Sequence, residues 1–205
     1  MPPSPVVAAV SIRRAEPADA PALAAFAAAC FRATYGPDAD PAAGGGSLAA
    51  DVAAYVDGCM DRAHFAADLV DASCATFVAE ATERALVGYA QLRVPSPAPA
   101  GAAVGAAVDD VVEGVVDDVA AELARLYVAP AWQGRGIAPA LLDAVQAEAA
   151  RAGARVLWLA VYRRNARAVG FYRRRGFAVA GAATFRMGAE VQDDWVMRRP
   201  VQPAS

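Results

Sequence analysis

The sequence predicts a mixed α/β fold in which one sheet is covered by helices, and three observations support this. The run "RVLWLAVY" at 155–162 is almost continuously apolar, as in a strand buried in the middle of a sheet. Strand-like runs near 75–80 and 86–94 flank a short polar turn, as in a hairpin. Apolar residues recur at helical spacing before and after these runs. Helices and strands that alternate in this way predict a sheet covered by helices.

The amino-terminal part begins with a tail at 1–9 that we expect to be disordered, followed by a strand at 10–14. A helix comes next. Asp19 is a suitable cap for it and Pro21 fits its first turn. Gly36 ends this helix because it is followed by proline.

A loop rich in alanine and glycine leads to a second helix over about 52–71, which we expect to be broken. The hairpin follows and turns near 82–83. The segment 95–118 starts with Pro, Gly and Ala and continues with Val among acidic residues. We interpret it as a mobile surface insertion, for which a solvated loop and an acidic lid over a cationic substrate are the two alternatives.

The carboxy-terminal part predicts a strand at 121–128, a glycine-containing turn and a helix that ends near Arg151. The apolar strand follows, then a helix over about 166–175 and two final strands. No repeat and no linker divides residues 10–199, so we expect one domain. Residues 200–205 then form a short tail.

The composition excludes several classes of function. The 205 residues contain 19 Lys plus Arg and 22 Asp plus Glu, a formal net charge of −3. This balance argues against a nucleic-acid partner. No apolar run is long and uncharged enough to span a membrane, and the first residues lack a signal-peptide pattern. We therefore predict a cytoplasmic protein with no membrane partner.

The cysteines and the single histidine predict neither a metal site nor a thiol nucleophile. Cys30, Cys59 and Cys74 form no C-x-x-C pair, and His64 is the only histidine. A zinc site, a Cys-His nucleophile and a Ser-His-Asp triad all need more partners than this set provides. Free thiols in a reducing compartment are the expectation.

The turn at 133–138, "QGRGIA", is the first candidate site. The first N–H groups of a helix have no acceptor within the helix, and together with the helix dipole they attract an anion. Gly134 and Gly136 permit close approach and unusual dihedral angles. The turn lacks the Gly-Lys-Ser/Thr of nucleotide triphosphatases, and Pro139 breaks the dinucleotide fingerprint. Taken alone, a single G-x-G favours a structural turn.

A second segment changes this interpretation. The pattern Gln133-x-x-Gly136-x-Ala138 resembles the pyrophosphate motif of the GCN5-related N-acetyltransferase (GNAT) family. "LAVYRRNARAVGFYRRRGF" at 159–177 resembles the second half of that family's acetyl-CoA site. The resemblance covers nearly all of the chain outside its tails and 95–118. It implies the GNAT fold, a mixed, mostly antiparallel sheet of six to seven strands with splayed central strands and about four helices.

The resemblance implies acetyl-CoA as co-substrate, no metal, and direct acetyl transfer to a primary amine. The backbone near the end of the 121–128 strand is expected to pair with the pantetheine arm. Asn165 and Tyr172 lie seven residues apart, on nearly the same helix face, which favours Tyr172 as a hydrogen-bond donor to the leaving thiolate over the alternative of a half-buried packing aromatic. The expected acetyl-CoA contacts are Leu126, Val128, Gln133, Gly134, Arg135, Gly136, Ile137, Ala138, Asn165, Phe171, Tyr172 and Arg174.

The acceptor amine needs a base, because an alkyl ammonium with a pKa near ~10 has no free lone pair. Glu122 is the predicted base. An ordinary strand carboxylate, alone or partnered with Arg125, is an alternative of equal weight, and a water relay is the alternative route for the proton. Phe31, Tyr35 and Tyr55 are predicted to contact the acceptor.

The stretches "AELARLYV", "GYAQLRV" and "TFRMGAEVQDDWVM" resemble the bacterial spermidine/spermine N-acetyltransferases within this family. A polyamine such as spermidine or spermine is therefore the predicted acceptor. The length of 95–118 and Thr184, at a position where histidine is frequent, depart from that branch. The alternatives are an amino acid, an aminoglycoside-like amine or a peptide N-terminus, or a non-catalytic acetyl-CoA-binding regulator. Because dimers are common in the family, a second copy is a candidate partner.

Overall fold

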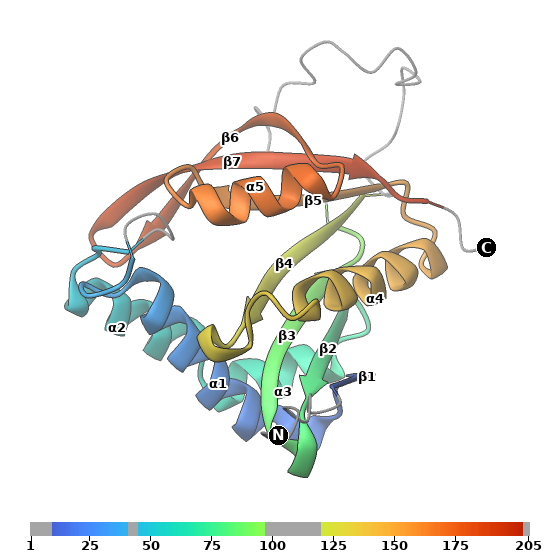
Figure 1. The fold of residues 1–205 in the computed structure, drawn as a ribbon, viewed down its shortest axis with the longest axis horizontal. Coiled ribbons are helices and arrows are strands. Elements are labelled where there is room, and N and C mark those ends of the chain that lie inside the picture. The colour runs from blue at the N-terminus through green and yellow to red at the C-terminus, as the bar shows by residue number, and fades with distance from the viewer. Residues whose placement is uncertain (1–9, 41–44, 97–119, 203–205) are drawn as a thin grey trace, which may run out of the picture.

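The computed structural model of the chain describes residues 10–40, 45–96 and 120–202. The predicted tail at 1–9 and nearly all of the predicted insertion at 95–118 lie outside these residues. The described residues form one sheet of seven strands in the order β1-β2-β3-β4-β5-β7-β6, with helices on both faces (Figure 1). The strands are β1 (Ser11–Arg14), β2 (Cys74–Glu80), β3 (Leu86–Arg93), β4 (Ala120–Val128), β5 (Val156–Tyr162), β6 (Ala178–Met187) and β7 (Glu190–Pro200).

The described residues contain five α-helices, where about four were predicted. They are α1 (Ala20–Tyr35), α2 (Ala49–Cys59), α3 (Arg62–Val70), α4 (Ile137–Arg151) and α5 (Ala166–Arg174). The additional helix comes from the predicted break. The carboxylate of Asp61 accepts a hydrogen bond from the N–H of His64 at 2.8 Å. This cap starts α3 as a separate helix.

Asp19 occupies the cap position of α1 but does not cap it as predicted. Its carboxylate instead accepts two bonds from the Arg13 guanidinium, at 2.7 and 2.8 Å, and one from the N–H of Glu16. Charge-assisted bonds to a guanidinium are stronger than a neutral cap bond, which explains the difference. Arg13 also binds Glu80 on β2. Its guanidinium therefore joins the edge strand β1 both to β2 and to the residue that precedes α1.

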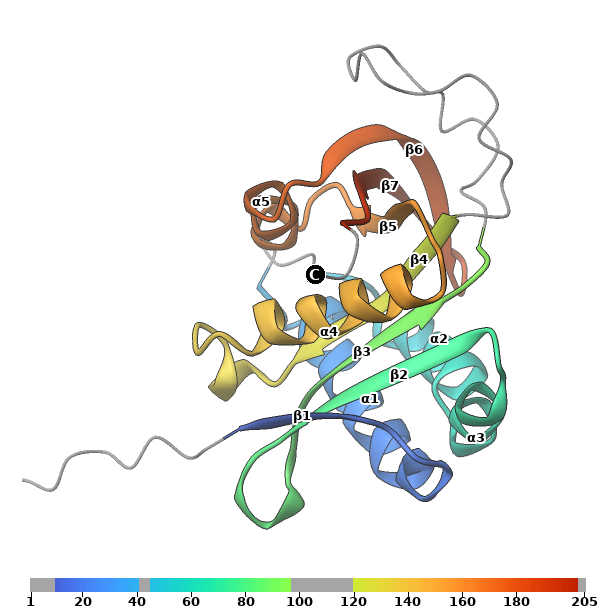
Figure 2. The same ribbon diagram turned by 90° about the vertical axis from the view of Figure 1, so that its right-hand side faces the viewer.

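The helices divide into two layers (Figure 2). α4 and α5 pack on one face over a core that includes Leu141, Leu157 and Tyr172. α1, α2 and α3 pack on the other face over a second core that includes Phe31 and Tyr89. None of the helices in the described ranges is long and apolar enough to cross a membrane.

Gly88 on β3 sets how closely α4 approaches the sheet. A Cβ at this position would lie 3.1 Å from Leu141 and 3.2 Å from Ile137, both on α4. Any larger residue would push the first turn of α4 outward. The position of this turn matters because the predicted anion site lies there.

Every neighbouring pair of strands is antiparallel except β4 and β5. These two are parallel and pair only through Ala120–Glu122 and Val156–Trp158. Beyond that point they diverge (Figure 1). The predicted mixed sheet with splayed central strands is therefore confirmed.

β4 also contains a bulge opposite β3. Gln91 pairs with Arg125 and Leu92 pairs with Leu123, so Ala124 is the extra residue. Such a bulge bends its strand and changes which side chains face each side. Leu123 enters the core under α4, whereas Arg125 points toward α2 and α3.

Candidate active site

A cleft of about 670 Å³ opens where β4 and β5 diverge. Its lining comes from residues 123–128 of β4, from the turn between 132 and 139 without Arg135, from Ala160 and Val161 of β5, from residues between 165 and 175 around α5, and from Thr34 and Tyr35 at the end of α1. Backbone groups of a strand need partners, and here one edge of β4 has no strand beside it. A ligand with amide groups along its length can supply those partners.

The turn before α4 takes the conformation that its glycines predict. Gly134 and Gly136 have φ values of 76° and 81°, in the left-handed region. Gly136 is the N-cap of α4 and offers no side-chain bond to the helix. An added Cβ at either glycine would meet nothing within 4 Å, so the backbone angle, not lack of space, requires glycine. The first N–H groups of α4 therefore lack a side-chain cap at the cleft.

Gln133 joins the turn to the end of β4. Its Nε2 donates to the carbonyl oxygen of Val128 at 3.1 Å. This bond fixes the path of the chain between the strand and the helix. The side chain of Gln133 is itself exposed.

α5 forms the opposite wall and is positioned by Asn165. The Oδ1 of Asn165 accepts from the N–H of Ala168 at 2.9 Å and caps the helix. This bond uses the amide oxygen and leaves the two Nδ2 donors for other partners. Asn165 is buried at the edge of the cleft, so it combines a structural and a candidate binding role.

Tyr172 lies further along α5 and also lines the cleft. Its ring packs edge-on between Phe171 and Phe177, with centroid distances of 5.2 and 5.6 Å. Burial raises the pKa of Tyr172 above its usual range. The phenol is therefore neutral near neutral pH and acts as a hydrogen-bond donor.

The structure brings most of the predicted cofactor contacts to this one cleft. Arg135 is the exception, because its guanidinium lies over the ring of Trp132, 4.9 Å from the centroid. The predicted residues that line the cleft are Leu126, Val128, Gln133, Gly134, Gly136, Ile137, Ala138, Asn165, Phe171, Tyr172 and Arg174. Trp132 and Arg167 line it as well and were not among the predicted contacts, although Arg167 lies within the segment 159–177.

Of the three predicted acceptor contacts, only Tyr35 lines the cleft. Phe31 is 2% exposed and stacks on Tyr55 at 4.7 Å. Tyr55 in turn meets Phe185 edge-on at 5.1 Å. Phe31 and Tyr55 therefore pack within the second core, and Tyr35, as the last residue of α1, reaches the opening.

Glu122 does not line the cleft. It belongs to the last paired residues of β4, and its Oε2 accepts from the Oγ of Ser96 at 3.1 Å. The carbonyl oxygen of Ser96 accepts from the Nε1 of Trp158 at 2.7 Å. These bonds hold the start of the β3–β4 connection against both central strands. The role of Glu122 as a base stays a prediction.

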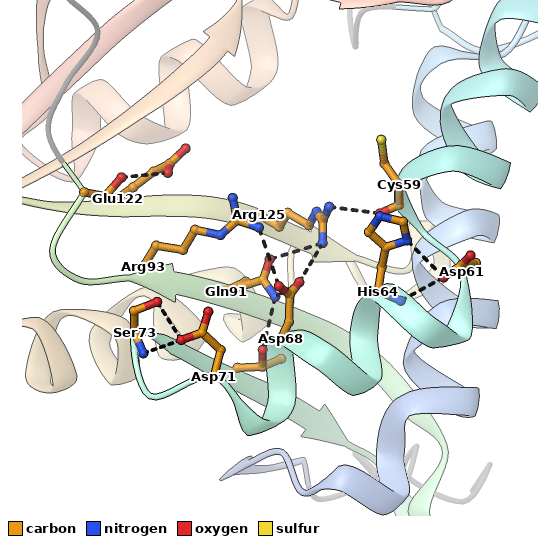
Figure 3. Close-up of polar contacts among 12 residues, drawn as sticks. Cys59, Asp61, His64, Asp68, Asp71, Ser73, Gln91, Arg93, Glu122 and Arg125 are labelled. Atoms are coloured by element: carbon orange, nitrogen blue, oxygen red, sulfur yellow. Dashed lines mark hydrogen bonds and ion pairs between the residues drawn. The ribbon is translucent and has the colours of Figure 1, made fainter.

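Arg125 is the centre of a polar cluster between β4 and α3 (Figure 3). Its guanidinium donates to the carbonyl of Cys59 and to Oε1 of Gln91, both at 3.1 Å. It also lies 3.6 Å from Oδ2 of Asp68 and over the ring of Phe65. Since Arg125 lines the cleft, this cluster fixes one cleft wall to α2 and α3.

The three cysteines are unpaired, and Cys30 and Cys74 are buried. Burial raises the pKa of both thiols to about 11, which disfavours the thiolate form of a nucleophile. In the part of the chain that the structure describes, no group of three or more His, Cys, Asp or Glu side chains is placed to hold a metal ion.

Comparisons with known proteins agree with this architecture. The family described as "Acetyltransferase (GNAT) family" matches residues 47–177. Uncharacterized N-acetyltransferases of Mycobacterium bovis and Mycobacterium tuberculosis are 36% identical over 181 residues, which is 88% of this chain and 97% of theirs.

Solved structures show the same fold at lower identity. PaiA N-acetyltransferase from Thermoplasma acidophilum, in complex with coenzyme A, has a TM-score of 0.67 and 18% identity, over 94% of this chain and 99% of that one. The acetyltransferase yncA from Salmonella typhimurium, with acetyl-CoA, has a TM-score of 0.61 and 19% identity, over 97% of both chains. With the family match and the 36% identical relatives, these findings identify the chain as a member of the GNAT family, an acetyl-CoA-dependent N-acetyltransferase.

Proposed function

We propose that the protein transfers an acetyl group from acetyl-CoA directly to a primary amine of a small molecule, with a polyamine such as spermidine or spermine as the preferred acceptor. The cleft between the splayed strands carries this proposal. It joins a glycine turn at a helix start on one wall to Asn165 and Tyr172 on the other.

The turn is suited to the pyrophosphate of acetyl-CoA. Backbone N–H groups between Gln133 and Ala138 are available there, and the dipole of α4 adds a partial positive charge. Arg174 and Arg167 line the same cleft and supply charged donors for the adenosine phosphates. Arg135 contributes through its backbone, since its guanidinium stacks on Trp132.

The open edge of β4 is suited to the pantetheine arm. Leu126 and Val128 lie on the part of β4 that has no β5 partner, and both line the cleft. The Nδ2 group of Asn165 offers donors from the opposite wall. An extended chain with amide groups therefore finds hydrogen-bond partners on both sides.

Tyr172 is proposed to assist the leaving group. When bound, acetyl-CoA supplies a thioester carbonyl to the amine and a thiolate leaving group. A thiol has a pKa of about 8.5 and a phenol about 10, and burial raises the pKa of Tyr172 further. Complete loss of the phenol proton is uphill, so Tyr172 acts as a neutral hydrogen-bond donor to the sulfur.

Aromatic rings at the acceptor end support a cationic substrate. Tyr35 and Tyr127 both line the cleft, and the faces of such rings attract ammonium groups. The formal net charge of −3 also favours approach of a cation. An amino acid, an aminoglycoside-like amine and a peptide N-terminus share the same reacting group and are the alternative acceptors.

The test is release of the coenzyme A thiol with spermidine, spermine, an amino acid, an aminoglycoside and a short peptide as acceptors. We expect turnover with the polyamines, and we expect Tyr172→Phe to lower kcat. Tyr89→Phe is the matched control, since it removes a buried phenol oxygen outside the cleft lining. Turnover with an amino acid and none with polyamines would reject the preferred acceptor alone. Sedimentation of the same sample tests the predicted homodimer.

A further inference from the structure

Asp194 on β7 is a buried carboxylate with no hydrogen-bond partner in the part of the chain that the structure describes. The residue is 7% exposed, and its Oδ1 is fully buried and accepts no hydrogen bond from any described residue. Within the described ranges, no cationic side chain lies within 4.0 Å of it. Buried charges are ordinarily paired because desolvation is costly, so an unpaired carboxylate points to a missing cation.

The pairing of the strands shows which face carries Asp194. It lies opposite Tyr162 on β5, and alternation places it on the same face as Gln192. Nε2 of Gln192 donates to Oγ of Ser47 at 3.2 Å, and the N–H of Ser47 donates to the carbonyl of Tyr35 at 3.1 Å. Asp194 therefore faces the end of α1, on the side of the sheet opposite α4.

Asp194 is not among the residues that line the cleft, but the face of the sheet that carries it continues to the cleft wall. Ala160 lines the cleft and pairs with Val196, which follows Asp194 on the same face of β7. Burial, and after it the negative charge of Asp194, raise the pKa of Tyr35 above its usual range. The carboxylate thus lies within electrostatic reach of a phenol that lines the acceptor end.

Within the described ranges, no charged group forms an ion pair with Asp194. Arg163 lowers the pKa of Asp194 by its charge, but its guanidinium lies 4.0 Å from the ring centroid of Trp195, whose side chain points to the other face. The Nε of Arg163 is itself buried without a hydrogen-bond partner among the described residues. Asp193 is the next residue on β7 and is exposed. Burial raises the pKa of Asp194 to about 6, Arg163 opposes this rise, and Asp193 adds to it.

We propose that Asp194 receives the ammonium group of the acceptor amine beside Tyr35 and removes its first proton. This assignment rests on the proposed function. The carboxylate takes one proton from R–NH₃⁺, and the freed lone pair forms the bond to the acetyl carbon while the carbon–sulfur bond breaks. The departing sulfur takes the electron pair of that bond and receives the second nitrogen proton. Asp194 then returns its proton to water.

Gln192 extends this site along β7. Among the described residues its Oε1 also has no hydrogen-bond partner although it is buried, and Gln192 lies two residues from Asp194 on the same face. Two residues of a strand span roughly 6.6 Å. A second N–H donor in the acceptor, at a spacing of this order, would satisfy this oxygen. The pair therefore fits an amine that carries more than one nitrogen.

The experiment compares Asp194→Asn with Asp193→Asn. The two substitutions are chemically identical and lie on adjacent residues, but only the first alters the buried face. Spermidine is titrated calorimetrically into enzyme saturated with coenzyme A, and amine kinetics are measured from pH 5 to 9. We expect Asp194→Asn to weaken spermidine binding and to lower kcat/KM for the amine by at least tenfold, with affinity for coenzyme A unchanged. Asp193→Asn should match the parent.

A measurement on the parent protein keeps the proposal testable if Asp194→Asn misfolds. Spermidine affinity of the coenzyme A complex should increase as pH rises through about 6, because the carboxylate must be ionised. A flat profile, or equal amine binding and turnover in Asp194→Asn and parent, overturns the assignment while leaving the proposed function intact. Absence of turnover with every amine rejects the proposed function. If spermidine binding depends on Asp194 but no amine is acetylated, Asp194 is a cation-binding residue and its proposed role as a base is rejected.

Discussion

Glu122 on β4 and Trp158 on β5 are the last pair of residues that these parallel strands share. Ser96 connects the two, since its hydroxyl donates to Glu122 and its carbonyl accepts from the indole of Trp158. The strands diverge from this point, so the pair marks the closed end of the cleft. The position of the cleft is therefore set by side-chain bonds at one end as well as by the splay.

The first prediction concerns Glu122. Glu122→Gln should keep kcat within about threefold and lower stability by about 0.5–1.5 kcal/mol, because its carboxylate holds Ser96 outside the cleft. Glu122→Gln weakens this bond because an amide oxygen is a weaker acceptor than a carboxylate, and Ser96→Ala removes it, so the double variant should cost little more than Ser96→Ala alone. Amine kinetics and urea unfolding measure both effects. A large fall in kcat at normal stability would instead make Glu122 the base.

The second prediction tests the anion site at the start of α4. Ala138→Asp should weaken acetyl-CoA binding at least roughly tenfold, because a carboxylate in the first turn competes with the pyrophosphate. Stability should hold or rise by about 0.3–1 kcal/mol, since the helix dipole favours an acid there. Ala140→Asp is the control, since Ala140 is exposed and does not line the cleft. Equal binding by both variants would contradict the site.

The third prediction concerns the leaving group. Tyr172→Phe should lower kcat by roughly 10- to 100-fold with little change in the KM for acetyl-CoA, because only the donor to the sulfur is lost. Tyr89→Phe should leave kcat unchanged. It should not reduce stability, since the lost hydroxyl is buried without a partner. Steady-state kinetics of the two variants are sufficient, and equal rates would exclude the proposed role of Tyr172.

The fourth prediction follows from the raised pKa of Asp194. Its pKa rises from a usual 3.8 to about 6 on folding, so ionisation opposes folding. The contribution of Asp194 to folding stability is fully present below about pH 4, where the carboxyl is protonated, and is lost as pH rises through about 6. Asp194→Asn should therefore stabilise the ligand-free protein by about 1–3 kcal/mol at pH 8 and by little at pH 4. Unfolding curves at both pH values test the sign.

The fifth prediction concerns the Arg125 cluster. Arg125→Met should cost about 2–4 kcal/mol, because it leaves Asp68 and Gln91 without their buried partner. Arg93→Met is the control. Arg93 also approaches Asp68, at 3.7 Å, but it is 44% exposed, so its loss should change stability by less than about 1 kcal/mol. Similar losses in both variants would show that burial does not govern this cluster.

Local patterns predicted most of the elements. The apolar spacing of α1 and the continuous apolar run of β5 placed these elements within about two residues. The left-handed angles of Gly134 and Gly136 follow from residue type alone, because other residues are strained there. Asp61 was missed as a cap because it lies inside a helical pattern, and only the start of α3 reveals its role.

Side-chain placement across elements was harder to predict. Tyr35, Phe31 and Tyr55 looked equivalent as aromatic residues near the opening, yet only Tyr35 lines it. Asp194 was not identified from the sequence. It lies two residues before Val196 on the same strand, so alternation puts both side chains on one face, and that face is buried. The Oδ1 of Asp194 has no hydrogen-bond partner among the described residues, which is a property of the packed structure.

The sequence by itself determined the glycine turn before α4, the cap and phenol on α5 and the order of helices and strands, because these depend on neighbours within a few residues. Only the tertiary structure decided that β4 and β5 separate after Glu122, that this carboxylate binds Ser96, and that Asp194 is buried without a hydrogen-bond partner among the described residues. These facts depend on contacts between segments far apart in the chain, where burial and charge are set by packing.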